Sequence, residues 1–443
     1  MARRRRRRRL QAEPIELEIT AVAHDGRGIA HVEGKTVFVH GALQGERVRA
    51  KYVARYRQYD VTDTVEVLRA SPVRSVPRCE HFGYCGGCAL QHMQPDAQVA
   101  MKQSLMLEQL ERLSRVAPAE ILAPLRASEW GYRRKARLGV RDVPKKGRVL
   151  VGFRERHSNY IADLKRCDVL VPEIGGRLPA LSELIGSLSL RSQIPQIEVA
   201  VGDNAAALVF RTLEQPAQED LECLGEFGKA HQIQILLQPG GPEHLIPLWP
   251  ARPDLWYELP EEGVRIRFRP TDFTQVNAAI NRQMVARAVD LLAPEKGDSI
   301  LDLFCGLGNF TLPLAKRCDR VVGVEGDPGL IERARANAAA NGIGNARFLA
   351  ADLSGDQSHS AWAGERFDKV LLDPPRSGAR EVLPLIAARA PSRIVYVSCN
   401  PATLARDAGD LVNRYGYRLQ GAGVMDMFPH TGHVESIAVF ERS

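Results

Sequence analysis

A cysteine lies directly after a predicted buried strand near the end of the chain. The apolar run at 393–398 leads into Ser398, Cys399, Asn400 and Pro401, so the thiol sits where the strand ends and a turn begins. Reactive side chains are commonly displayed at such positions, whereas a cysteine of the core would lie within the strand. A thiolate there can add to carbon 6 of a uracil, which makes carbon 5 nucleophilic enough to accept a methyl group. The alternative is that Cys399 is a small apolar residue of the core.

Release of a product from such an adduct requires a base that removes the proton from carbon 5. The segment 428–436, FPHTGHVES, stands at the start of a predicted final strand and offers His430, His433 and Glu435 for this role. The residue types alone do not choose among the three. We expect the base to share one crevice with Cys399.

A glycine-containing turn follows another predicted strand and is typical of a site for an adenosine cofactor. The run 299–304 leads into DLFCGLGN, which spans Asp302 to Asn309, and a helical pattern comes next. Backbone without side chains can approach a ligand closely at such a turn. A second strand at 320–324 ends in Glu325, an acid placed to accept hydrogen bonds from a ribose diol. A dinucleotide would use the same turn and acid, so this signal alone is ambiguous.

Three features favour S-adenosylmethionine over a nicotinamide cofactor. Thr311 stands where the dinucleotide fingerprint expects a third glycine, so no pyrophosphate need be held. Asp352 follows a third strand and can meet an adenine amine. Asp373 begins a rigid DPPR turn after the fourth strand, at the carboxyl edge where open α/β sheets bind ligands.

Three clustered cysteines predict a metal centre. Cys79, Cys85 and Cys88 are spaced C-x5-C-x2-C, and a tetrahedral site needs a fourth ligand, for which Cys167 is the best candidate. The spacing alone does not separate zinc from an iron-sulfur cluster. We interpret the remaining cysteines, Cys223, Cys305 and Cys318, as structural.

Length and composition indicate a cytoplasmic protein of two or three domains. The chain has 443 residues, more than one hydrophobic core usually organises. It contains no apolar run of the roughly eighteen residues that a membrane span needs, and no signal peptide is recognisable. Cysteines in such a chain point to thiols, metal ligands or catalysis, because disulfides are rare in a reducing compartment.

The basic residues are concentrated in two stretches. Arg3 to Arg9 account for the whole formal net charge of +7 and predict either a disordered phosphate-binding arm or a solvated tail. Residues 131–166 carry twelve lysines and arginines, interleaved with aromatic residues, against Asp142, Glu155 and Asp163. This second stretch can hold a phosphate backbone and stack unpaired bases, or it can be a solvated face.

The pattern of elements predicts a multidomain α/β protein. After a basic tail at 1–13, short alternating runs punctuated by glycines at 14–70 favour a small β-barrel of the oligonucleotide-binding type. Residues 71–262 are mixed α+β and contain the cysteines and the basic stretch. Strands and helices alternate at 263–443, which is typical of a doubly wound, Rossmann-like sheet.

The motifs resemble those of the RNA uracil-C5 methyltransferases over nearly the whole chain. The resemblance rests on five segments: 273–277 (FTQVN), 302–309, 373–376, 398–401 and 433–435. The segment 24–48, HDGRGIAHVEGKTVFVHGALQGERV, is similar to a TRAM domain, whose usual role is RNA binding. With this barrel and four cysteines, the chain looks most like the branch that methylates a uridine of 23S ribosomal RNA and carries a [4Fe-4S] cluster.

The resemblance implies a role for each matching residue. Cys399 would be the nucleophile and Glu435 the base. Cys79, Cys85, Cys88 and Cys167 would hold the cluster. The residues implied to contact S-adenosylmethionine are Gln275, Phe304, Asn309, Glu325, Asp352 and Asp373. The partner would be 23S ribosomal RNA, and we expect a monomer.

Three other functions remain open from the sequence. A tRNA uridine C5 methyltransferase would use the same chemistry, although that branch usually lacks the barrel and the cysteines. A methyltransferase of exocyclic amines also places an acid before two prolines but needs no thiol, so Cys399 argues against it. A TRAM-bearing RNA-binding metalloprotein would not need a complete S-adenosylmethionine fold.

Overall fold

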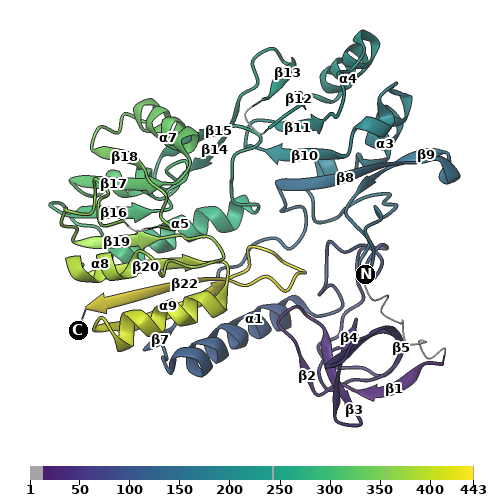
Figure 1. The fold of residues 1–443 in the computed structure, drawn as a ribbon, viewed down its shortest axis with the longest axis horizontal. Coiled ribbons are helices and arrows are strands. Elements are labelled where there is room, and N and C mark those ends of the chain that lie inside the picture. Colours follow the sequence, from purple (N-terminus) through teal and green to yellow (C-terminus); the bar gives the residue numbers. More distant parts are fainter. Residues whose placement is uncertain (1–12, 242–243, 356, 443) are drawn as a thin grey trace, which may run out of the picture. The chain divides into compact units, whose positions relative to one another are not determined.

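The computed structural model describes residues 13–241, 244–355 and 357–442 and divides into two compact units (Figure 1). Unit 1 takes in the chain up to Lys102 together with the short segments 155–158 and 429–433. Unit 2 consists of residues 103–154, 159–428 and 434–443. The arginine run at 3–9 lies outside the described residues.

Unit 1 contains a six-stranded sheet in the order β1-β5-β6-β4-β3-β2. Glycines separate strands whose alternate residues are buried, and the inward side chains form a small apolar core that includes Leu17, Val37, Val39 and Val48. The short alternating runs predicted at 14–70 correspond to the strands of this sheet. The strands are β1 (Ile15–Glu18), β2 (Ala21–Val22), β3 (Gly28–Val32), β4 (Lys35–His40), β5 (Arg47–Arg55) and β6 (Tyr59–Arg69).

The cysteine-containing segment follows the sheet in unit 1. Residues 71–94 form turns and isolated bridges, and helix α1 (Pro95–Gln109) comes next. Proline is well tolerated in the first turn of a helix because the amide it lacks would have no partner there. A π-helical turn, Leu110–Ser114, ends the helix in unit 2.

Unit 2 begins with a mixed sheet in the order β13-β12-β11-β10-β8-β9. Its central strands β10, β11 and β12 are buried along almost their whole length, as their continuous apolar runs require. The strands are β8 (Lys135–Val143), β9 (Arg148–Gly152), β10 (Gln196–Val201), β11 (Ala206–Arg211), β12 (Ile233–Gln238) and β13 (Ile246–Trp249). The accompanying helices are α2 (Pro172–Gly175), α3 (Leu178–Ser187) and α4 (Gln218–His231).

A two-stranded hairpin, β14 (Leu255–Leu259) and β15 (Val264–Phe268), leads into an eight-stranded sheet in the order β18-β17-β16-β19-β20-β22-β21-β7 (Figure 1). The five strands from β18 to β20 are mutually parallel, whereas β22 runs antiparallel to β20 and β21. The strands are β7 (Glu120–Ile121), β16 (Ser299–Leu303), β17 (Arg320–Glu325), β18 (Ala346–Ala350), β19 (Lys369–Leu372), β20 (Arg393–Ser398), β21 (Tyr417–Met425) and β22 (Glu435–Arg442). The helices are α5 (Ala278–Leu292), α6 (Thr311–Ala315), α7 (Pro328–Ala340), α8 (Leu383–Arg389) and α9 (Pro401–Asn413).

Helices cover both faces of the eight-stranded sheet. Val395 and Val397 of β20 belong to the core that contains the buried residues of α5, α6 and α7. Tyr396 lies between them and points to the opposite face, where its hydroxyl donates to Asp407 of α9. The alternation predicted at 263–443 is therefore confirmed as a doubly wound sheet.

The sheet order reverses at β16, whose neighbours are β17 on one side and β19 on the other. Ligands of open α/β sheets bind at the carboxyl ends of the strands beside such a reversal. The turns that follow β16 and β19 contain the glycines at 306 and 308 and Asp373, so the topology brings these two motifs to one point. Among the described residues, no helix is both long and apolar enough to cross a membrane.

Candidate active site

The turn between β16 and α6 has the backbone conformation of a ligand-binding turn. Phe304 has a φ of 65°, Gly306 of 53° and Gly308 of 91°. A left-handed conformation at a residue other than glycine costs on the order of 1–3 kcal/mol and is concentrated at functional sites. At Gly306 a Cβ atom would meet nothing within 4 Å, so this side of the turn is open. The turn therefore leaves room for a ligand beside exposed backbone.

Three carboxylates surround this turn. Glu325, at the end of β17, accepts hydrogen bonds from the amides of Gly306 (3.1 Å) and Gly326 (2.7 Å). Burial raises the pKa of Asp302 to about 7, and the charges of Asp373 and Glu325 add to this effect against the hydrogen bond from Thr311. Burial beside Glu325 likewise raises the pKa of Asp373 to about 7. A cationic ligand would be stabilised here, because its charge would offset the cost of ionising Asp302, which is buried, beside the half-buried Asp373 and Glu325.

Asn309 and Gln275 lie close to two residues that no motif predicted. The amide groups of Asn309 and Asn281 exchange hydrogen bonds of 3.0 and 3.1 Å, and the Tyr257 hydroxyl donates to Asn309 at 2.9 Å. Gln275 lines a pocket together with Tyr257, Asn281 and Arg282. Tyr257 comes from the hairpin and Asn281 from α5, so only the folded chain brings them to the turn.

Asp352 is arranged differently from the buried acids. It lies two residues beyond β18, is exposed, and accepts hydrogen bonds from the backbone amide (3.0 Å) and hydroxyl (2.7 Å) of Ser354. These bonds lower the pKa of its carboxyl group. The structure thus keeps Asp352 ionised at the surface.

Cys399 lies between the last residue of β20 and the first residue of α9 and is half-buried. Burial raises the pKa of its thiol to about 11, and the negative charges of Glu435 and Asp373 add to this, whereas Arg376 opposes it. Glu435 begins β22, whose Ser436 pairs with Ser398 of β20, and its side chain is buried. The structure thereby brings the predicted nucleophile, one predicted base and the predicted cofactor acid Asp373 together.

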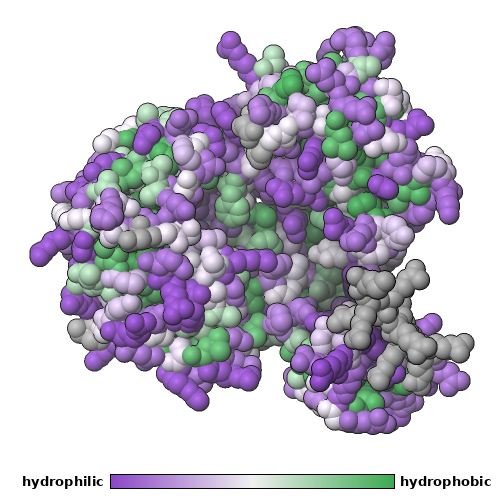
Figure 2. Space-filling view, viewed as in Figure 1, coloured by the Kyte–Doolittle hydropathy of each residue, from purple (hydrophilic) through white to green (hydrophobic). Residues whose placement is uncertain are grey.

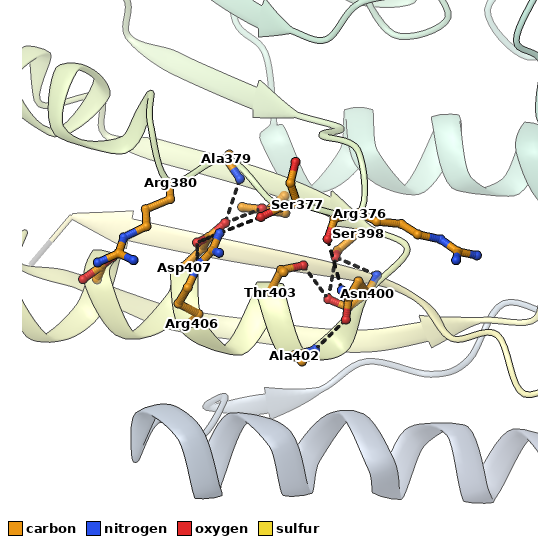
Figure 3. A network of polar contacts seen from close by, with 12 residues as sticks. Arg376, Ser377, Ala379, Arg380, Ser398, Asn400, Ala402, Thr403, Arg406 and Asp407 are labelled. Carbon is orange, nitrogen blue, oxygen red and sulfur yellow. Dashed lines mark hydrogen bonds and ion pairs between the residues drawn. The ribbon is translucent and has the colours of Figure 1, made fainter. Parts of the chain in front are cut away.

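The diproline turn after β19 is fixed to α9 by a network of polar contacts (Figure 3). The buried carboxylate of Asp407 accepts from the Ala379 amide at 2.8 Å and from the Arg406 guanidinium. Arg406 also donates to the carbonyl of Ser377 at 2.8 Å.

Asn400 adds a second link between the turn and the helix. Its amide group donates to the Arg376 carbonyl at 3.1 Å, while its oxygen caps α9 by accepting from Ala402. In Figure 3 the side chain of Arg376 extends away from the Asp407 contacts. The carbonyl of Arg376 and the amide of Ala379 therefore anchor the backbone of the turn to α9.

The predicted metal ligands are distributed over both units. Cys79, Cys85 and Cys88 are half-buried in the turns of unit 1, and Cys167, also half-buried, belongs to unit 2. The amide of Gly87 points at the Cys85 sulfur at 3.3 Å, an arrangement that stabilises a thiolate. The three cysteine sulfurs of unit 1 and the amide that points at one of them therefore fit a metal centre bound by thiolates.

The other three cysteines are Cys223, Cys305 and Cys318, of which Cys305 lies in the turn between β16 and α6. Cys305 and Cys318 are buried, and burial raises the pKa of both thiols. The Cys223 sulfur lies 3.9 Å from the hydroxyl of Ser187. Their raised pKa keeps Cys305 and Cys318 in the thiol form at neutral pH.

The basic stretch at 131–166 is more completely paired than its sequence indicates. Arg134 bonds to Asp203 at 2.5 Å and Arg137 to Glu198 at 2.6 Å, carboxylates that lie outside the stretch. Burial lowers the pKa of Lys135 to about 8. Over β8 and β9 the visible surface mixes hydrophilic and apolar residues (Figure 2). Fewer basic side chains are therefore available to RNA than the number of lysines and arginines in the stretch indicates.

The fold and the carboxyl-edge site define an S-adenosylmethionine-dependent methyltransferase, and comparison with known proteins agrees. Residues 254–443 match the family model for tRNA (uracil-5-)-methyltransferases, and residues 8–59 match the TRAM domain. The solved structure of the Pyrococcus abyssi tRNA (uracil-54, C5)-methyltransferase with S-adenosyl-L-homocysteine is similar at a TM-score of 0.73. The two share 25% identity, over 96% of this chain and 100% of the other.

Two curated relatives define the family more narrowly. The 23S rRNA (uracil(1939)-C(5))-methyltransferase RlmD of Alkalilimnicola ehrlichii is 57% identical over 439 residues, 99% of both chains. The protein of the same name from Methylococcus capsulatus is 55% identical over 443 residues, 100% of both chains. The chain belongs to the RlmD family of RNA uracil-C5 methyltransferases.

Proposed function

We propose that this protein transfers a methyl group from S-adenosylmethionine to carbon 5 of a uracil in 23S ribosomal RNA. The observation that carries the proposal is the position of Cys399, whose thiol lies near Glu435 and Asp373 at the carboxyl edge of the sheet. A methyltransferase of exocyclic amines would have no use for a cysteine there. The RlmD relatives match the chain over its whole length, which favours ribosomal RNA over the tRNA named for the more distant solved structure.

S-adenosylmethionine would be held by residues of the turn and its surroundings. The open side of Gly306 and the buried carboxylates suit a ligand with a cationic sulfonium and an ammonium group. The residues that we propose to contact it are Gln275, Phe304, Asn309, Glu325, Asp352 and Asp373. Bound there, it supplies the methyl group.

Cys399 would form the covalent bond to the uracil. Its sulfur, after losing the thiol proton, adds to carbon 6, and the electron pair of the double bond moves into the ring and onto the carbonyl oxygen at carbon 4. Carbon 5 would then bond to the methyl carbon while the bond between that carbon and the sulfonium sulfur breaks, so that the neutral thioether S-adenosylhomocysteine leaves. The high pKa of the resting thiol means that its proton must be removed as the RNA binds.

Glu435 would end the reaction by acting as the base. Its carboxylate takes the proton from carbon 5, the electron pair restores the double bond between carbons 5 and 6, and the Cys399 sulfur leaves carbon 6. Its side chain is buried at the start of β22, which pairs with β20 beside Cys399. The other candidates, His430 and His433, belong to unit 1.

Cys79, Cys85, Cys88 and Cys167 would hold a [4Fe-4S] cluster that stabilises the central part of the chain and its RNA surface. The hydrogen bond to the Cys85 sulfur supports a thiolate ligand. A Cys85→Ala protein should lose iron and RNA affinity and retain S-adenosylmethionine binding. Unchanged RNA affinity after loss of iron would contradict this role.

Further proposals concern the organisation of the chain. We place the domain limits at 14–70 for the TRAM barrel, 71–262 for the central domain and 263–443 for the methyltransferase domain, and expect a monomer. Because ribosomal RNA is the substrate, we expect the protein in the cytoplasm. The basic tail before the barrel would add non-specific phosphate contacts.

The decisive experiment uses 23S ribosomal RNA that contains 5-fluorouridine. Fluorine cannot leave as a cation, so the base cannot complete the reaction and the protein should remain linked to the RNA when S-adenosylmethionine is present. Mass spectrometry should place the link on Cys399 and identify the nucleotide. A Cys399→Ala protein should form no link, and a link or turnover in that variant would refute the mechanism. Cys223→Ala is the matched control.

A further inference from the structure

The segment immediately before Glu435 is held by unit 1. Pro429 to His433 belong to that unit, and His430 is buried with a φ of 64°. Its carbonyl oxygen accepts two hydrogen bonds, from the amides of Ala89 (2.8 Å) and Leu90 (3.0 Å). These two residues come directly after Cys88, so the cysteine-containing segment continues into the contact with His430.

Gln98 of α1 fixes the same segment from a second side. Its side chain is 2% exposed, and its oxygen accepts from the His430 amide at 2.9 Å. Its amino group donates to the carbonyls of Met93 (2.8 Å) and Leu90 (3.1 Å) and lies 3.3 Å from Nδ1 of His430. A buried amide whose donors and acceptor are all engaged is costly to misplace, so it sets one position for the segment.

The barrel contacts the segment from a third side. At Gly432 an added Cβ would lie 2.7 Å from the carbonyl oxygen of His24 and 2.9 Å from Cα of Asp25. Only glycine permits this approach of two backbones. The segment is therefore enclosed by the turn at 24–25, by the residues after Cys88 and by α1.

We propose that Gln98 is a positioning residue for the proton-removal step: it holds His430 and thereby sets where the chain delivers Glu435, five residues further on. The proposal rests on the proposed function, in which Glu435 is the base. Left-handed backbone at His430 supports it, because a strained conformation persists only where surrounding contacts enforce it. Gln98 itself touches neither the RNA nor S-adenosylmethionine in this role.

A displaced base would stop the reaction at a defined stage. The Cys399 sulfur would still add to carbon 6 and carbon 5 would still take the methyl group. The proton at carbon 5 would remain, however, so the bond between sulfur and carbon 6 could not break. Methylated RNA linked to the protein would accumulate on ordinary uridine, without any fluorinated analogue.

The test compares Gln98→Leu with Glu435→Gln and with the control Gln94→Leu. Gln94 precedes α1, is exposed, and donates one hydrogen bond to the Pro72 carbonyl, so its loss should leave turnover unchanged. We expect Gln98→Leu to lower kcat by about 10–100-fold, since a misplacement near 1 Å has effects of this size. KM for RNA should fall together with kcat, because a covalent intermediate accumulates when its breakdown limits turnover, and kcat/KM should therefore stay within about twofold. Protein-linked, methylated RNA should accumulate.

A second variant, Gln98→Glu, keeps the proposal testable if the Gln98→Leu protein folds poorly. Gln98→Glu keeps an oxygen that can accept from His430 but turns a second oxygen, in place of two donors, toward the carbonyls of Met93 and Leu90, so it should also accumulate linked RNA. Iron content and the thermal melting of each purified holoprotein show whether its fold is retained.

Each outcome decides between the two proposals. Linked RNA in both Glu435→Gln and Gln98→Leu supports the inference. A second outcome is that Glu435→Gln accumulates linked RNA but neither Gln98 variant does, because both turn over freely or lose activity before any link forms. This result overturns the inference and leaves the proposed function standing. No linked RNA in Glu435→Gln removes Glu435 as the base, which overturns the inference and this one role within the proposed function, whereas the 5-fluorouridine experiment tests the Cys399 adduct separately.

Discussion

Replacing Asp407 with asparagine should loosen the diproline turn. The carboxylate is fully buried and accepts hydrogen bonds from the Ala379 amide (2.8 Å), the Tyr396 hydroxyl (2.7 Å) and the Arg406 guanidinium (2.8 Å). A hydrogen bond to a buried charged group contributes about 1.5–3 kcal/mol. Asparagine keeps one oxygen and turns an amino group toward a donor, so at least one bond is lost. We expect the free energy of unfolding to fall by about 2–3 kcal/mol on this basis.

Urea unfolding of the two variants Asp407→Asn and Asp410→Asn measures this difference. Asp410 lies on the same helix, but its partner Arg414, at 3.1 Å, is exposed, and such pairs contribute only about 0.3–0.5 kcal/mol. Asp407→Asn should also lower kcat more than it changes the affinity for S-adenosylmethionine, because the turn positions Asp373 beside Cys399. The argument is refuted if the two variants unfold within about 0.5 kcal/mol of each other at an unchanged m value.

Three further predictions follow from charge and backbone geometry. Asp373, with a pKa of about 7, is mostly protonated at pH 6 and ionised at pH 8, so affinity for the cationic S-adenosylmethionine should rise about tenfold over this range by calorimetry. An Asp373→Asn protein should show a smaller rise, because Asp302, whose pKa is also about 7, still ionises beside the turn, and an equal rise in the two proteins would contradict the role of Asp373. Mass spectrometry can follow the alkylation of Cys399 by iodoacetamide, and the rate of this reaction should increase from pH 9 to 11. At pH 9 the Glu435→Gln protein should react faster than the unchanged protein, because removing a negative charge lowers the pKa of the thiol. Equal rates in the two proteins would contradict that coupling. Gly378 has a φ of 84°, and an added Cβ would lie 2.5 Å from a carboxylate oxygen of Asp407, so Gly378→Ala should lower the free energy of unfolding in urea by about 1–3 kcal/mol. Gly364→Ala is the control, because its Cβ would meet open space and should leave the free energy of unfolding unchanged.

The sequence predicted the sheet and its edge well because parallel strands buried on both faces are continuous apolar runs. The predicted run at 393–398 coincides with β20, and the strand expected before Asp373 is β19. Once the strands are placed, the carboxyl edge must contain both Asp373 and Cys399. Local pattern and topology together were sufficient for this part of the site.

Contacts between distant segments were not predictable in the same way. Tyr257 and Asn281 bond to Asn309 from a hairpin and a helix that contain no recognisable cofactor motif. Asp203 and Glu198 neutralise arginines more than sixty residues earlier in the chain. Such pairing depends on strand order and register, here the pairing of β8 with β10, which composition does not reveal.

The two reacting groups are fixed by different parts of the molecule, and this should separate the kinetic effects of mutations. The turn beside Cys399 is anchored within unit 2 by Asp407, whereas the segment that leads to Glu435 is anchored within unit 1 by Gln98. A loosened Asp407 network should slow formation of the covalent adduct, and a loosened Gln98 contact should slow its resolution. In single-turnover experiments the first change should therefore deplete protein-linked RNA and the second should enrich it, although neither side chain touches the uracil. Identical time courses for the two variants would mean that both anchors act on a common step.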